Sequence, residues 1–103
     1  MSVLRWRGPR PLDRIALTRG ISALELDGYT WSNAPGDSYP PHAHPYDKVV
    51  IVLEGSIAFA LPEVDRDILL QEGDRLELHA GIVHSAVVGG QGVTCWEAQR
   101  AVG

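Results

Sequence analysis

The stretch GDSYPPHAHPYDKVVIVLEG, residues 36–55, contains the main evidence for the fold. It holds the pair His42 and His44, then a run from Lys48 to Leu53 that is rich in β-branched residues, and then the turn signal Glu54-Gly55. Side chains alternate along a strand, so the two histidines are predicted to share one face. That spacing suits two ligands of one metal ion.

A second pair of histidines, His79 and His84, follows the turn signal Glu72-Gly73-Asp74. Neutral imidazole is the commonest protein ligand for Zn, Fe, Mn, Cu and Ni, so a third histidine on another strand strengthens the metal interpretation. Three histidines with one open position form a known catalytic arrangement. Without a metal, His42 and His44 would be polar residues that hydrogen-bond loop backbone at a barrel mouth.

Both histidine pairs lie in patterns that resemble the two cupin motifs. The pattern Gly36-x5-His42-x-His44-x3-Lys48-x6-Gly55 is similar to the first motif, and Gly73-Asp74-x4-His79-x-Gly81-x2-His84 is similar to the second. The resemblance is to small single-domain, RmlC-like cupins of the cupin 2 type. It implies an all-β fold, an antiparallel double-stranded β-helix (jelly-roll) barrel with little or no helix. It also implies that a divalent metal ion, Zn, Fe, Mn or Ni, binds to His42, His44 and His84.

Lys48 departs from that pattern, because the family has a glutamate ligand at this position. To coordinate a metal, a lysine must lose its proton, which costs about 4–5 kcal/mol at neutral pH. Three alternatives follow. The ammonium turns away from a three-histidine metal site, it pairs with a carboxylate such as Asp47 or Asp37, or its charge replaces the metal and holds an anionic ligand.

His79 and Val88 also depart from the pattern, since they stand where the family has a proline and an asparagine. Leu76 and Leu78 are expected to share one face of a strand, which points His79 away from the interior. A solvated or interface histidine is therefore predicted, and a fourth metal ligand is the alternative.

The first hypothesis is a three-histidine metal enzyme that acts on a small anionic molecule, and the resemblance implies chemistry of the oxygenase, isomerase or decarboxylase type. Lys48 is the candidate catalytic residue, to steer or protonate the substrate. The alternative is a non-catalytic, metal-free cupin that binds a small molecule. Trp31, Tyr39 and Tyr46 are candidate pocket residues, because ligand pockets are mainly apolar with a few polar groups.

Turn signals outside the motifs agree with short strands. Eleven glycines and seven prolines among 103 residues are too many for a helical bundle. Residues 1–20, with Pro9 and Pro11, are predicted to form an extended arm that packs on the barrel or on a partner. Residues 21–103 are predicted to form the barrel, with a first strand over 21–26.

The run from Lys48 to Leu53 is apolar on both faces. Val50 and Val52 are predicted to point inward with Lys48, and Val49, Ile51 and Leu53 to point outward. Monomers seldom expose such a patch, so the N-terminal arm or a second subunit should cover it. This pattern predicts a homodimer.

Charge and hydropathy limit the other classes of partner. Five arginines against one aspartate give residues 1–20 a net charge of +4, and the remaining residues carry −8. An acidic body argues against nucleic acid as the main partner. No apolar run approaches the 18 residues of a membrane span, and the start has no apolar signal segment. We therefore expect a cytoplasmic protein with no membrane partner.

Overall fold

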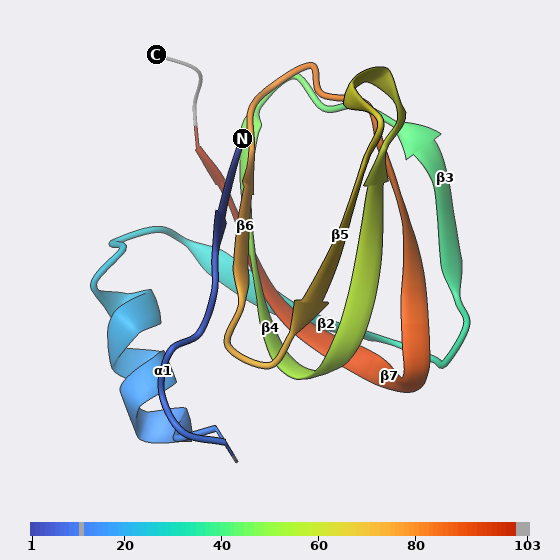
Figure 1. Ribbon diagram of the computed structural model, residues 1–103. Coiled ribbons are helices and arrows are strands. Elements are labelled where there is room, and N and C mark those ends of the chain that lie inside the picture. The colour runs from blue at the N-terminus through green and yellow to red at the C-terminus, as the bar shows by residue number, and fades with distance from the viewer. Residues whose placement is uncertain (11, 101–103) are drawn as a thin grey trace.

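The fold was analysed in a computed structural model that describes residues 1–10 and 12–100. The elements in these ranges, in chain order, are β1 (Ser2–Leu4), α1 (Arg14–Ser22), β2 (Gly28–Asn33), β3 (Ser38–His42), β4 (Asp47–Leu61), η1 (Pro62–Val64), β5 (Arg66–Gln71), β6 (Arg75–Leu78) and β7 (His84–Arg100). Figure 1 shows the strands curving around one interior, with α1 outside the barrel and away from β3. Pro11 of the predicted arm and residues 101–103 of the predicted barrel lie outside the described residues.

The two long strands β4 and β7 run antiparallel and form the frame of the barrel. Their register shifts between Val52 and Glu54, and again between Gly55 and Ile57, so both strands bend there. Before the bend, β4 pairs with β6 and with the end of β7; after it, β4 pairs with β5 and with the start of β7. Strand β1 pairs with β6, and both β2 and β3 pair with β7. All of these pairings between the described strands are antiparallel. The predicted jelly-roll barrel is confirmed.

Gly55 lies at the bend, where the sequence predicted a turn between two separate strands. Its φ is +78°, and a Cβ atom there would lie 2.0 Å from the carbonyl oxygen of Gly92. Only glycine fits both conditions, which accounts for the glycine that ends the first motif pattern.

Residues of β4 alternate between two apolar clusters, as the sequence predicted. Val50 and Val52 pack inside the barrel, while Val49 and Ile51 pack outside it against Leu17 of α1. The chain therefore covers its own outward apolar face. The homodimer stays a prediction, but this face no longer requires one.

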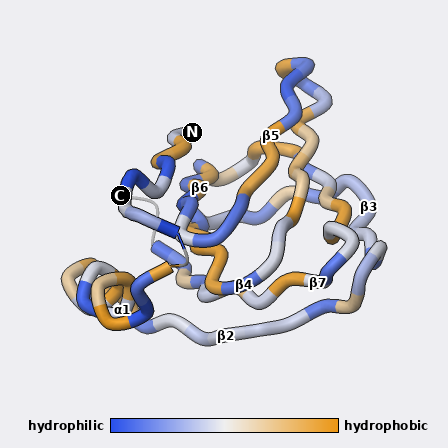
Figure 2. Tube along the Cα trace, turned by 60° about the horizontal axis from the view of Figure 1, so that its bottom comes forward, coloured by the Kyte–Doolittle hydropathy of each residue, from blue (hydrophilic) through white to orange (hydrophobic). Residues whose placement is uncertain are grey.

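The predicted extended conformation is wrong for residues 14–20, and the predicted strand over 21–26 is also wrong. Asp13 caps α1 by accepting hydrogen bonds from the backbone N–H groups of Ile15 (3.0 Å) and Ala16 (3.2 Å). Leu17 and Ile21, one helical turn apart, pack on the outer face of β4. Figure 2 shows α1 as a separate segment beside the barrel, with hydrophobic and hydrophilic residues interspersed. No helix in the described part of the chain is long and apolar enough to cross a membrane.

Asp74 holds the segment before α1 against the barrel. Its side chain is buried and accepts hydrogen bonds from the backbone N–H groups of Trp6 (2.9 Å) and Gln71 (3.0 Å). Arg5 adds an ion pair at 3.0 Å. The position after Gly73, which the sequence marked only as a turn, is therefore an anchor between distant parts of the chain.

We expect Asp74→Ala to lower the free energy of unfolding by about 2–4 kcal/mol, because two N–H groups and a guanidinium lose their acceptor. Urea denaturation followed by tryptophan fluorescence measures this, since Trp6 lies in the anchored segment. Asp67→Ala, which removes an exposed carboxylate from β5, is the matched control and should change little. Equal effects of the two substitutions would contradict the anchoring role.

Candidate metal centre and pocket

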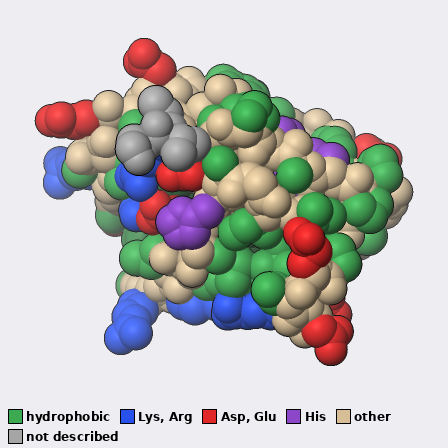
Figure 3. Space-filling model, turned by 90° about the horizontal axis from the view of Figure 1, so that it is seen from above, with side chains coloured by type: hydrophobic (Ala, Val, Ile, Leu, Met, Phe, Trp, Pro, Cys, Tyr) green, Lys and Arg blue, Asp and Glu red, His purple; other side chains and the backbone are tan. Residues whose placement is uncertain are grey.

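A cavity of about 310 Å³ lies within the barrel, at the end where β3 finishes and β4 begins. Its lining combines histidines, aromatic side chains and one ion pair: Tyr29, Trp31, Tyr39, His42, His44, Tyr46, Lys48, Ile57, Phe59, His84, Ala86 and Glu97. Figure 3 views the molecule from above: one histidine side chain stands out beside acidic and basic ones, and others are partly visible among hydrophobic side chains. The volume falls at the lower end of the range for small-molecule pockets.

The structure brings His42, His44 and His84 together. One ring nitrogen from each lies within 4.8 Å of the others, and the ring centroids are 4.3–5.2 Å apart. His42 ends β3, directly opposite His84 at the start of β7. His44 lies beyond the end of β3, so the prediction that one strand carries both His42 and His44 is wrong, although their rings still meet.

Hydrogen bonds to backbone carbonyls orient two of these rings. The Nδ1 atom of His42 lies 2.7 Å from the oxygen of Pro40, and that of His84 lies 3.0 Å from the oxygen of Ile82. A carbonyl only accepts, so in the neutral rings Nδ1 carries the proton and Nε2 carries the lone pair. Metal-binding histidines in proteins are commonly oriented in this way.

The Nε2 atoms of His44 and His84 are buried and have no hydrogen-bond partner among the residues that the structure describes. A buried polar atom without a partner lowers the stability of the fold by about 1–3 kcal/mol. We therefore expect each of these two Nε2 atoms to bind a ligand. Burial lowers the pKa of His44, and the charges of Lys48 and His42 lower it further. Burial also lowers the pKa of His84, by more than the hydrogen bond to Ile82 raises it. Both rings are therefore neutral at pH 7, and the three histidines fit a divalent metal ion.

Metal-free protein should lose stability as the pH falls below about 6.5, because unfolded His44 and His84 then take up protons that the folded rings still refuse. The contribution of the two neutral rings to the free energy of unfolding is fully present above that pH. It is lost as the pH falls towards the lowered pKa values of His44 and His84 in the folded protein. Urea midpoints in the presence of EDTA at about pH 7.5 and 5.5 measure the loss. His84→Gln should make the loss smaller, and an unchanged pH dependence would contradict the assignment.

Lys48 pairs with Glu97 of β7 and not with Asp47 or Asp37. The Lys48 Nζ atom lies 3.1 Å from Glu97 Oε1, and both side chains are largely buried. Asp47 instead accepts a hydrogen bond from the Ala80 N–H at 2.8 Å, and Asp37 accepts one from the Ala34 N–H at 3.0 Å. The second alternative for Lys48 was therefore right in kind but named the wrong carboxylates.

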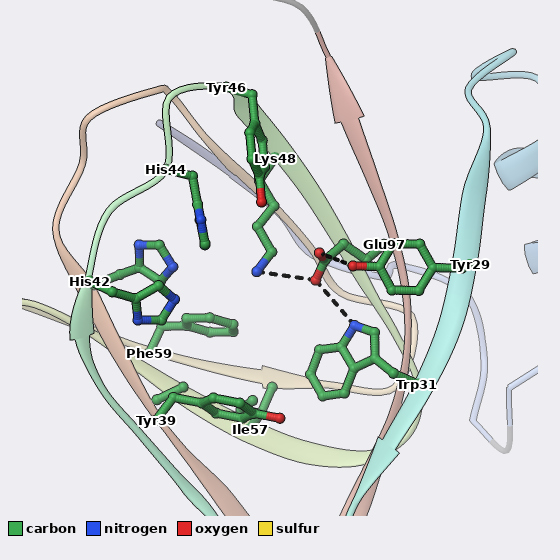
Figure 4. Close-up of a pocket in the computed structure, with 12 residues that line it drawn as sticks. Tyr29, Trp31, Tyr39, His42, His44, Tyr46, Lys48, Ile57, Phe59 and Glu97 are labelled. Atoms are coloured by element: carbon green, nitrogen blue, oxygen red, sulfur yellow. Dashed lines mark hydrogen bonds and ion pairs between the residues drawn. The ribbon is translucent and has the colours of Figure 1, made fainter.

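Glu97 is the site residue that the sequence reasoning missed, together with Tyr29. The Tyr29 hydroxyl donates to Glu97 Oε2 at 2.6 Å, and Trp31 Nε1 donates to Oε1 at 3.1 Å (Figure 4). The hydrogen bond to Glu97 raises the pKa of Tyr29 to about 12, with burial as the next cause. The sequence holds a pattern that indicates this position. Val93, Cys95 and Glu97 are every second residue of one strand and so share a face, and the first two are apolar residues of the interior.

The remaining predicted residues divide into two groups. Trp31, Tyr39 and Tyr46 line the cavity, and the ring of Tyr46 stacks on that of His44 with centroids 4.9 Å apart. The side chain of His79 is 65% exposed and lies outside this cavity, 3.9 Å from Asp47. The outward orientation of His79 is confirmed.

Comparisons with known proteins agree with this fold. The cupin domain family matches residues 29–96, about two thirds of the chain, so the chain belongs to the cupin family. No curated protein matches the sequence. The family match defines the class of protein as a small cupin barrel.

Solved structures of other cupins are similar to this chain. A cupin superfamily protein from Desulfitobacterium hafniense has a TM-score of 0.65 at 19% identity, over 75% of this chain and 68% of that one. The DMSP lyase DddQ from Ruegeria pomeroyi has 0.67 at 24%, over 74% and 38%. The polyketide cyclase RemF from Streptomyces resistomycificus has 0.64 at 29%, over 72% and 54%. Neighbours of this fold thus include enzymes.

Proposed function

We propose that this cupin holds one divalent metal ion on His42, His44 and His84 and takes a small molecule into the adjoining cavity. The observation that carries the proposal is the pair of buried Nε2 atoms, on His44 and His84, for which residues 1–10 and 12–100 provide no hydrogen-bond partner. Zn, Fe, Mn and Ni are the candidate ions, since imidazole suits each of them in proteins.

The chain's own residues would support an enzyme of the oxygenase, isomerase or decarboxylase type. Three histidines would hold the ion and leave room in its coordination shell for a small molecule, and the aromatic side chains that line the cavity would shield that molecule from solvent. When bound, the ion would supply Lewis-acid activation or oxygen binding. Lys48 is the candidate catalytic residue because its ammonium lies inside the same cavity.

A metal-free binding protein is the second candidate, favoured by the lysine that replaces the family's glutamate. Isothermal titration of Zn, Fe(II), Mn and Ni into EDTA-treated, tag-free protein separates the two. About one equivalent of at least one ion should bind, and His44 and His84 should release few protons because their lowered pKa values keep both rings neutral at pH 7. No binding of any of the four ions would favour the metal-free alternative.

A homodimer and a cytoplasmic location remain part of the proposal. Light scattering at micromolar concentration tests the first, and a monomer mass would contradict it. In that case the outward face of β4 is covered by this chain's own residues, which among those described run from Trp6 through α1 to Leu26.

A further inference from the structure

Lys48 and Glu97 form a second polar centre in the cavity, separate from the three histidines. The side chain of Lys48 is 12% exposed and that of Glu97 is 6% exposed, so the pair is shielded from solvent. Figure 4 shows Lys48 extending into the cavity beside His44, with Glu97 on the far side of its ammonium. A ligand that reaches the histidines from the cavity therefore also comes close to this ammonium.

The carboxylate of Glu97 is largely occupied by donors from the chain itself. Three donors meet it, from Tyr29, Trp31 and Lys48, at 2.6, 3.1 and 3.1 Å. A carboxylate has about four acceptor positions, so little capacity remains for a ligand. Glu97 therefore fixes the position of Lys48 and is not itself placed to receive a ligand.

Lys48, in contrast, keeps donor capacity. An ammonium has three N–H groups, and Glu97 is the one partner that the described residues provide for it. The other N–H groups face a cavity whose walls are mostly aromatic, including Trp31, Tyr46 and Phe59. Flat walls of this kind suit a planar ligand, and a lone buried cation suits an anionic oxygen.

We propose that Lys48, positioned by Glu97, is the specificity-determining residue of the cavity and selects small planar molecules that carry a carboxylate or a comparable oxyanion. This deepens the proposed function, on which it rests for the second contact of the ligand with the metal. Glu97 is a positioning residue and also limits affinity, because its charge offsets that of Lys48. Removing the charge of Glu97 should therefore tighten the binding of an anion.

Benzoate and its neutral analogue benzamide are the probes, titrated into protein with and without saturating Zn by calorimetry. Wild-type protein should bind benzoate at least about tenfold more tightly than benzamide. Glu97→Gln, whose amide oxygen can still accept from Trp31 while its NH2 group donates to the Tyr29 hydroxyl, should tighten benzoate binding by about tenfold. Lys48→Met/Glu97→Gln, which removes both charges together and leaves neither unpaired, should abolish the preference.

Two results would overturn the proposal: weaker or unchanged benzoate binding in Glu97→Gln, or a preference for benzoate that survives in the double variant. Absence of a preference in wild-type protein would overturn it too. Zinc binding is measured separately in the same titrations. If zinc fails to bind but EDTA-treated protein still prefers benzoate through Lys48, the metal proposal fails and the role of Lys48 stands.

Discussion

His84→Ala is expected to abolish stoichiometric metal binding. His84 is 2% exposed, and its Nε2 atom has no hydrogen-bond partner in the described part of the chain. Its ring centroid lies 4.3 Å from that of His42 and 5.2 Å from that of His44. Removing one of three protein ligands leaves two, which bind an ion too weakly to compete with water and buffer molecules as ligands. Calorimetric titration of the variant should show affinity lower by at least about a hundredfold.

His79→Ala is the matched control, since it removes the exposed histidine that lies outside the cavity. It should bind metal as the unaltered protein does. Metal binding that survives in His84→Ala, or that is lost equally in both variants, would contradict the three-histidine assignment.

Lys48→Glu is expected to have two large effects of opposite sign. The substitution supplies the glutamate that the cupin pattern has at this position and removes a cation beside the histidines. Affinity for a divalent ion should rise by at least about tenfold, because attraction replaces repulsion at short range. Metal-free protein should lose about 3–5 kcal/mol of stability, because Glu97 loses its partner and two buried carboxylates then face each other.

Titration calorimetry measures the first effect, and urea denaturation with EDTA measures the second. Lys48→Met is the intermediate control: it removes the cation without adding an acid, so its metal affinity should lie between the other two. Equal or weaker metal binding by Lys48→Glu would mean that the charge at residue 48 does not act on the metal site. Unchanged stability of the metal-free variant would contradict the buried ion pair.

The metal candidates could be predicted from local spacing because the motif residues lie at fixed offsets. His42 and His84 face each other directly in the pairing of β3 and β7, and each ring is oriented by a carbonyl two residues before it. The position of His44 depends on the connection after β3, which a strand period does not describe. The site was therefore predictable as a set, and its exact geometry was not.

The partner of Lys48 was not predictable from its neighbours in sequence. Glu97 of β7 lies opposite Val50 of β4, and this register depends on the two shifts where β4 and β7 bend. Asp47 and Asp37 are nearer in sequence, but both are engaged with loop backbone. Only the inward alternation of Val93, Cys95 and Glu97 pointed to an acid in the interior.

Helix α1 was missed because its stability is tertiary. It has nine residues, and isolated helices of that length are marginal in water. Packing of Leu17 and Ile21 on the outer face of β4 stabilises it, and that face was recognised in the sequence as one that needed a cover. The pattern thus predicted a cover for the strand but not its secondary structure.

The most direct test of the account is elemental analysis of the protein purified without a histidine tag and without added metal. The cluster of His42, His44 and His84, with the pKa values of His44 and His84 lowered, predicts about one equivalent of a divalent transition metal per chain, lost in His84→Ala and kept in His79→Ala. Folded protein that contains no such metal and takes none up from solution would contradict the central claim.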